Sequence, residues 1–497
     1  MFPKNIKINR LTILKIKSID YHFYWVGVIT ILFLQLFKAF DGLTTHWLAD
    51  QSNVAQHFMY WHKNYFYGVY MSGTNPIVYT FGPVAIFLLS FPSLLGFNPE
   101  VAHQTLILLN TSGLLLLAWI LRESKEHRFV FFIFSFVLMF ATNYWRILTI
   151  FWLTSLLVFF ALLFLSAMVY YFNKPTLNSF FLFLCASCLP LHVHSSPAFV
   201  IPLVLYAIGY HILVIRSYEK LSFFTKAILF ITFVPYLLGE LYNEFDNADA
   251  ILQNIIHNHY TQRIIGITGG KQALDSIFQH HGINYSWFGV KNYNSVDTWK
   301  GIFIIINILG MIIISFFKRF AYHWQRHYWR CFPFLLLFHF LFFYITNRQI
   351  ISPHYLTFST IIYSMGYALV IGLWLSKLYF NSLIIIVILL VIQVQSMNYS
   401  REVPYWSYRR MTVILDEIAK DTDNICMLYN PNFEPSAGKR YNSLEFLLLN
   451  YYNKNLTYKR DSDYCVYFIR GGIKSQDIDP NYSFYKKIGE AEIYKKN

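Results

Sequence analysis

Apolar runs recur along the chain as far as residue 396, separated by short polar segments. Each run is close to the roughly 20 residues that a helix needs to cross about 30 Å of hydrocarbon. The pattern predicts a mainly α-helical polytopic membrane protein with about 11 transmembrane helices. The predicted spans lie at 22–40, 102–121, 129–145, 148–172, 178–194, 197–215, 227–243, 301–317, 331–347, 354–376 and 379–396.

One further apolar segment, 77–96, is interpreted differently. It contains Gly82, Pro83, Pro92 and Gly96, which interrupt a helix. We expect an amphipathic or re-entrant helix at the outer surface, not a crossing.

The distribution of basic residues supports this interpretation. Cytoplasmic loops of membrane proteins carry an excess of Lys and Arg. With 11 spans the N-terminus is cytoplasmic and most basic loops share its side, whereas a twelfth span at 77–96 would move the loops around Arg122 and Arg326 outside. The cytoplasmic set includes Lys4, Lys7, Arg10, Lys15, Lys17, Arg122, Lys125, Arg128, Arg216, Lys220, Lys226, Lys318, Arg319, Arg326 and Arg330.

Two regions extend beyond the predicted spans. Residues 1–396 form the expected transmembrane domain, with a first outer loop at 41–101 and another at 244–300. The tail, 397–497, is expected to be a small extracytoplasmic α/β domain. It combines helical patterns at Tyr408–Lys420 and Ser443–Tyr452 with strand patterns at Ile425–Tyr429, Tyr464–Arg470 and Ala491–Tyr494.

Composition agrees with this class. The chain is 56% hydrophobic and only 13% charged, whereas soluble domains carry roughly 25% charged residues. The net charge of +14 is dispersed over loops, so it indicates orientation in a membrane and not a nucleic-acid partner. The N-terminal apolar run lacks a small-residue cleavage site, which favours an uncleaved anchor. The predicted location is the plasma (inner) membrane.

The five cysteines carry little chemistry. Cys185 and Cys188 form a CxxC inside an apolar span, where a buried structural role is favoured over metal or redox work. Cys426 and Cys465 lie in the predicted outer tail, in strand-like runs that could be neighbours. An oxidising compartment would permit a disulfide there.

Polar groups at the predicted outer ends of spans are the candidate functional residues, because ionisable groups at a membrane edge are costly. The 11-span topology places all of them on one face of the bilayer. They are Asp50, His57, Tyr79, His194, Glu240, Arg263, Arg348, His354 and Tyr355. His192 closes the same span as His194, and Glu244, Asp246 and Asp249 follow Glu240.

The order of these motifs resembles the GT-C class of membrane glycosyltransferases, in particular bacterial relatives of the protein O-mannosyltransferases and of the lipid A aminoarabinose transferase. An acidic residue follows the first span, and a turn and a Gly-Pro-led apolar helix ending in Leu-Gly come after it. The HVHSS, PYLLGE and SPHYLTF stretches also resemble that class. The matching residues outside those three stretches are Asp50, Pro76, Tyr79, Gly82, Pro83, Leu95 and Gly96.

The resemblance implies a polyprenyl-phosphate sugar donor, a lipid, glycan or protein acceptor, and inversion at the anomeric carbon. An acceptor hydroxyl needs a base, and Asp50 is the best-placed candidate. The alternative role of Asp50 is an N-cap for the amphipathic run after it. Arg348, with Arg263 in reserve, is the candidate for the donor phosphate, with anchoring at lipid headgroups as the alternative.

The chain also departs from the family pattern. Asp50 is followed by Gln51 where many relatives carry Asp-Glu, the turn is Gly73-Thr74-Asn75-Pro76 without an acid or Lys, and His354-Tyr355 replaces an Arg-Tyr pair. The carboxylates that begin with Glu240 leave a divalent cation open, although their spacing matches no standard motif, and no other cofactor is indicated. A polysaccharide polymerase or a lipid-linked glycan flippase remains the alternative function.

Overall fold

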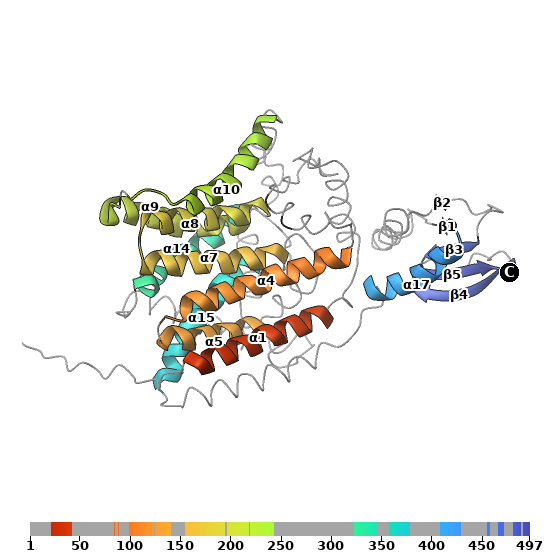
Figure 1. Cartoon of the computed structure of the whole chain (residues 1–497), viewed down its shortest axis with the longest axis horizontal. Coiled ribbons are helices and arrows are strands. Elements are labelled where there is room, and N and C mark those ends of the chain that lie inside the picture. The colour runs from red at the N-terminus through yellow and green to blue at the C-terminus, as the bar shows by residue number, and fades with distance from the viewer. Residues whose placement is uncertain are drawn as a thin grey trace, which may run out of the picture.

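The computed structural model describes the protein in part (Figure 1). All structural statements below concern these residues. They are 21–41, 84, 88, 99–123, 125–140, 155–193, 196–217, 219–242, 323–345, 357–377, 408–428, 455–457, 466–471, 481–488 and 491–497.

Long helices packed side by side form the larger part of the described structure (Figure 1). Their bounds are α1 (Tyr21–Asp41), α4 (Pro99–Leu121), α5 (Lys125–Phe140), α7 (Leu156–Asn173), α8 (Leu177–Cys188), α9 (Ile201–Tyr210), α10 (Phe223–Tyr242), α14 (His323–Ile345) and α15 (Thr357–Lys377). Two 3₁₀ turns, η4 (Leu189–His192) and η5 (Ser196–Val200), connect α8 to α9, and a π-helical turn, η6 (His211–Ile215), ends α9.

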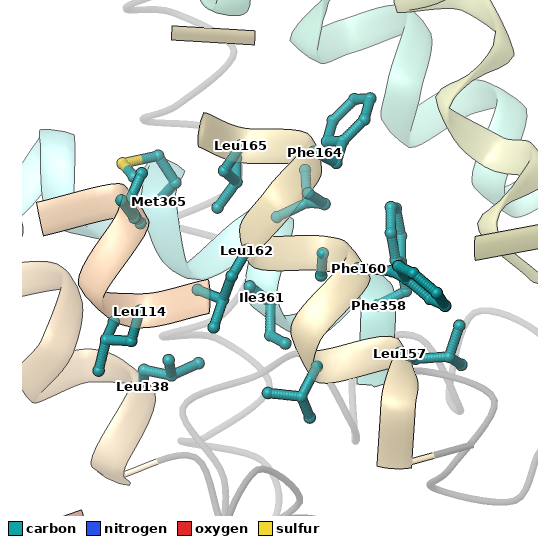
Figure 2. Packing of buried hydrophobic residues seen from close by; sticks show 14 of the residues in the cluster. Leu114, Leu138, Leu157, Phe160, Leu162, Phe164, Leu165, Phe358, Ile361 and Met365 are labelled. Atoms are coloured by element: carbon teal, nitrogen blue, oxygen red, sulfur yellow. The ribbon is translucent and has the colours of Figure 1, made fainter. Parts of the chain in front are cut away.

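Helix α7 is the centre of the bundle. Most of its side chains are buried, and α4, α8, α14 and α15 pack against it. Apolar residues of α4, α5 and α15 belong to the same cluster (Figure 2). Leu157, Phe160 and Phe164 point from α7 into this cluster. Gly113 of α4 lets the two helices approach, since a Cβ there would lie 3.1 Å from Leu162 of α7. The core therefore depends on both large apolar side chains and one small residue at a crossing.

The described helices coincide with nine predicted spans, and the spans at 301–317 and 379–396 lie outside the described residues. Among the described residues, three helical segments are long and apolar enough to cross a membrane, His103–Leu121, Leu156–Asn173 and Pro197–Ile215. Shorter apolar helices lie at Tyr21–Phe37, His127–Leu138, Leu177–His192, Phe223–Pro235 and Thr357–Val370. The mainly helical membrane class is confirmed in this form; the number of 11 spans stays a prediction.

Contacts between loops gather the basic segments at one end of the bundle. Lys174 and Glu123 form an ion pair at 3.0 Å, which joins the ends of α7 and α4. Trp324 of α14 donates from Nε1 to Nε2 of His127 in α5 at 2.8 Å. Asn178 accepts the backbone N–H of Ser222 at 2.7 Å, which joins the start of α8 to the segment before α10. All these segments are predicted to be cytoplasmic.

The tail contains helix α17 (Tyr408–Asp421) and a five-stranded sheet. The strands are β1 (Asn424–Leu428), β2 (Asn455–Thr457), β3 (Tyr467–Gly471), β4 (Tyr482–Ile488) and β5 (Ala491–Lys496), in the order β2-β1-β3-β5-β4. Strand β1 pairs in parallel with β2 and β3, whereas β5 is antiparallel to β3 and β4. Cys426 in β1 is disulfide-bonded, and Cys465 lies outside the described residues.

The predicted helix 408–420 and the strands at 425–429, 464–470 and 491–494 correspond to α17, β1, β3 and β5. The sequence interpretation missed β2 and β4. Strand β2 has only three residues. In β4 a register irregularity between Phe484 and Lys486 breaks the alternation of faces that would reveal a strand. The predicted helix 443–452 lies outside the described residues.

Candidate functional site

The segment between α8 and α9 turns the chain at the end of the bundle opposite the basic loops. It contains three prolines, Pro190, Pro197 and Pro202. Proline lacks an N–H and disfavours helical backbone at the residue before it, so the chain breaks into short 3₁₀ turns here. The prolines therefore account for the end of α8 and the start of α9. In the sequence, His194 and Ser195 lie between the two turns.

The second turn, η5, is fixed on α14 and α15 by Phe199. The Phe199 ring stacks on His339 of α14 with centroids 4.6 Å apart, and lies 6.0 Å from Phe358 and 5.9 Å from Tyr363 of α15. His339 Nδ1 and the Tyr363 hydroxyl share a hydrogen bond of 2.9 Å. All four side chains are buried. The pair therefore joins α14 to α15 at the level of η5, where an unsatisfied polar group would be expensive.

The first turn, η4, is fixed on α10. Helix α10 packs on α8, and the buried His192 and Cys185 side chains lie close to Thr232 of α10. Three residues further on, Pro235 interrupts the hydrogen-bond ladder of α10, because it has no N–H to give to the carbonyl of Ile231. Such positions bend helices. Helix α10 therefore contacts η4 at Thr232 and lacks one helix hydrogen bond at Pro235, just beyond that contact.

The candidate residues predicted from the sequence have side chains outside the described structure. This applies to Asp50, His57, Tyr79, His194, Arg263, Arg348, His354 and Tyr355. Glu240 belongs to α10, in its last turn, but its side chain is not described. Their mutual geometry therefore stays a prediction.

The described neighbours of several candidates do lie together. Phe199, five residues after His194, contacts Phe358, three residues after Tyr355. Helix α14 ends at Ile345, three residues before Arg348, and it carries His339 in the same contact. Helix α10, held at Thr232 beside His192, ends two residues after Glu240. Helix α1 ends at Asp41, nine residues before Asp50.

Sequence reasoning missed the His339–Tyr363 pair. Its signal was present, because His339 is an ionisable residue inside a predicted span, where such groups mark special positions. This end of the bundle holds η5, α14 and α15 together through the stacking of Phe199 on His339 and the hydrogen bond of His339 with Tyr363. Within the described residues, no group of three or more His, Cys, Asp or Glu side chains could hold a metal ion.

Comparison with known proteins finds similarity among solved structures. No protein-family model matches the chain, and no curated protein matches it. Among solved structures, the chain is similar to ArnT from Cupriavidus metallidurans bound to undecaprenyl phosphate, with 13% identity, a TM-score of 0.48 and coverage of 85% of this chain and 70% of ArnT. The apo structure of the same ArnT gives 11% identity, a TM-score of 0.41 and coverage of 95% and 97%. ArnT is the lipid A aminoarabinose transferase, a GT-C enzyme.

Proposed function

We propose that this protein transfers a sugar from a polyprenyl-phosphate donor to an acceptor hydroxyl at the outer face of the membrane. The observation that carries the proposal is the contact cluster of Phe199, His339, Phe358 and Tyr363. It supports the view that the segments carrying the sequence motifs converge. His194 and Tyr355 lie only five and three residues along the chain from members of this cluster, and a residue spans at most about 3.6 Å. The sequence motifs suggest the chemistry, and the contacts between the described helices support the proposed sidedness.

In the proposed reaction Asp50 is the general base. Its carboxylate takes the proton of the acceptor hydroxyl while the oxygen attacks the anomeric carbon of the donor sugar. The bond between that carbon and the phosphate oxygen breaks, and polyprenyl phosphate leaves with the bonding electrons. Attack opposite the leaving group inverts the anomeric configuration. The leaving phosphate is already a stable anion, so the reaction needs no strong general acid.

The proposed donor contact is made by Arg348. A guanidinium offers two parallel N–H donors to a phosphate, which an ammonium cannot match. Arg263 is the second cation proposed for the donor, while Glu240, His194, His57, Tyr79, His354 and Tyr355 are proposed to contact the sugar, the acceptor or the phosphate.

The decisive experiment is Asp50→Asn with Asp41→Asn as the matched control. Both variants lose one carboxylate, and Asp41 ends α1 only nine residues earlier. We expect Asp50→Asn to lower transfer at least 100-fold, within the range of about 10²–10⁴ for a general base, and Asp41→Asn to retain it. Product is measured by mass spectrometry of surface glycans and lipid A. Near-normal transfer by Asp50→Asn would remove Asp50 from the mechanism, and movement of lipid-linked glycan across liposomes without bond formation would favour a flippase.

A further inference from the structure

One exposed face of α14 is basic at its N-terminal end and apolar further along the helix. Arg326 and Arg330 are exposed, and the same stripe continues with Phe334, Leu337 and Leu341, which are 60%, 56% and 38% exposed. Positions four or three apart share a helix face. The 11 steps from Arg330 to Leu341 span about 16 Å along a helix, close to half of a hydrocarbon core of about 30 Å. The stripe is therefore cationic at one end and apolar over one leaflet.

Helix α9 lies beside this stripe and runs in the opposite direction. At one level Phe199, just before α9, contacts His339, and at the other level Tyr206 contacts His327. Ile201 and Leu205 of α9 are 39% and 62% exposed. We name this surface the α9–α14 face, made of Ile201, Leu205, Tyr206, Tyr210, Arg330, Phe334, Leu337 and Leu341.

Polar groups at the basic end of the α9–α14 face are held in place. The Tyr206 hydroxyl lies 2.6 Å from His327 Nδ1, and the Arg330 side chain lies near Tyr206. His327 is buried and stacks on Phe172 with centroids 4.5 Å apart. The half-buried Tyr210 stacks on Tyr206 at 6.3 Å.

We propose that the α9–α14 face binds an anionic phospholipid of the cytoplasmic leaflet. The phosphate contacts the Arg330 guanidinium and the edge formed by Tyr206 and Tyr210. The acyl chains lie along Leu205, Phe334 and Leu337. Charge complementarity selects the occupant, since an exposed arginine at the level of a lipid headgroup matches a phosphate. The cytoplasmic assignment follows from the basic loops at this end. The proposal is independent of the proposed transferase site, which lies at the opposite end.

The test uses purified full-length protein in detergent with phosphatidylglycerol, and phosphatidylcholine of the same chains as the zwitterionic probe. Native mass spectrometry measures retained lipid. We expect preferential retention of phosphatidylglycerol and about tenfold weaker binding in Arg330→Gln, as a lost charged hydrogen bond predicts. Arg330→Lys should recover part of the binding. The matched control is Arg122→Gln, which removes the same charge from the exposed end of α4 at the same end of the bundle.

Tyr206→Phe is the second variant, because it keeps the ring and its packing if Arg330→Gln fails to fold. We expect it to weaken phosphatidylglycerol binding about threefold, the equivalent of a modest net hydrogen bond. Equal retention of both lipids, equal losses in Arg330→Gln and Arg122→Gln, or unchanged binding in both Arg330→Gln and Tyr206→Phe would overturn the proposal. Displacement of phosphatidylglycerol by an equal concentration of polyprenyl phosphate would also overturn it, by assigning the face to the donor.

Discussion

At the residue scale, single polar side chains explain how helices of this apolar bundle are joined. Tyr24 of α1 donates to the carbonyl of Ala118 in α4 at 2.6 Å, and Asn110 of α4 accepts the N–H of Phe159 in α7 at 2.9 Å. His339 and Tyr363 do the same for α14 and α15. Hydrophobic burial is not directional, so these bonds select how the helices are rotated about their axes.

The His339–Tyr363 bond gives a stability prediction. Tyr363→Phe keeps the ring but leaves His339 without this partner in the core, so we expect a loss of about 1–3 kcal/mol. Thermal unfolding in detergent measures it. Exposed Tyr170→Phe in α7 is the matched control and should leave the midpoint unchanged. Equal midpoints for Tyr363→Phe and the unchanged protein would show that the bond contributes nothing.

Ion pairs in the tail give a prediction of pH dependence. The Lys495 ammonium and the Tyr467 hydroxyl hydrogen-bond to Asp421, at 2.7 and 2.5 Å, and hold the pKa of that carboxyl below its ordinary value. Lys486 and Tyr485 do the same for the pKa of Glu417. A lowered acid pKa stabilises the fold above the ordinary pKa, and that contribution is lost as the pH falls through the lowered value.

Asp421→Asn should therefore increase hydrogen exchange of the β5 amides at neutral pH and have no effect below the lowered pKa, where Asp421 is protonated in either state. Hydrogen-exchange mass spectrometry of the full chain at several pH values measures it. The control is Asp416→Asn, on the same helix α17. A difference between Asp421→Asn and the unchanged protein that persists in acid would contradict the electrostatic cause.

At the element scale, glycine positions decide how closely helices approach. A Cβ on Gly27 of α1 would lie 2.6 Å from the Phe132 ring of α5, whereas a Cβ on Gly209 of α9 would meet nothing within 4 Å. Phe132 is itself buried, so its ring has little room to move. Helix α1 can therefore pack this closely on α5 because residue 27 is glycine and has no Cβ.

We expect Gly27→Ala to destabilise the bundle by about 1–3 kcal/mol, as overpacking of a close contact does. Gly209→Ala is the matched control. It is expected to be neutral or to stabilise α9 by up to about 1 kcal/mol, because alanine favours helix. Thermal midpoints compare the two variants, and a Gly27→Ala midpoint at or above that of Gly209→Ala would contradict the packing argument.

At the scale of the whole molecule, the basic loops and the candidate site residues belong to opposite ends of the helical bundle. The ion pair of Lys174 with Glu123 and the contacts of Asn178 unite the basic loops at one end. The segments that flank His194, Glu240, Arg348 and His354 belong to the other end. A transferase that uses a lipid-borne donor needs its base and its phosphate contact on one side of the bilayer.

Cysteine accessibility tests this arrangement. In a background without the native free cysteines, Lys220→Cys should react with a membrane-impermeant maleimide only after the cells are permeabilised. Asn481→Cys in the tail should react in intact cells, since the tail is predicted to be extracytoplasmic. Both positions are exposed in the structure. Labelling of both residues in intact cells, or of neither, would contradict the 11-span topology.

The sequence by itself determined the helical membrane class, the positions of the described helices to within several residues, and most elements of the tail. These features depend on local properties, namely the length of apolar runs, the prolines between α8 and α9, and the alternation in strands. The sequence also supplied the candidates from Asp50 to Tyr355 and the resemblance to the GT-C class.

Only the tertiary structure decided which helices are neighbours and which polar residues meet. The contacts of Phe199 with His339 and Phe358, of Thr232 with His192, and of Tyr206 with His327 join residues 40 to 159 positions apart in the chain. An apolar helix can pack on almost any other, so its sequence pattern does not name the partner. The physical reason is that rotation and register are selected by the joint fit of several helices, to which small residues such as Gly27 and Gly113 and buried hydrogen bonds contribute.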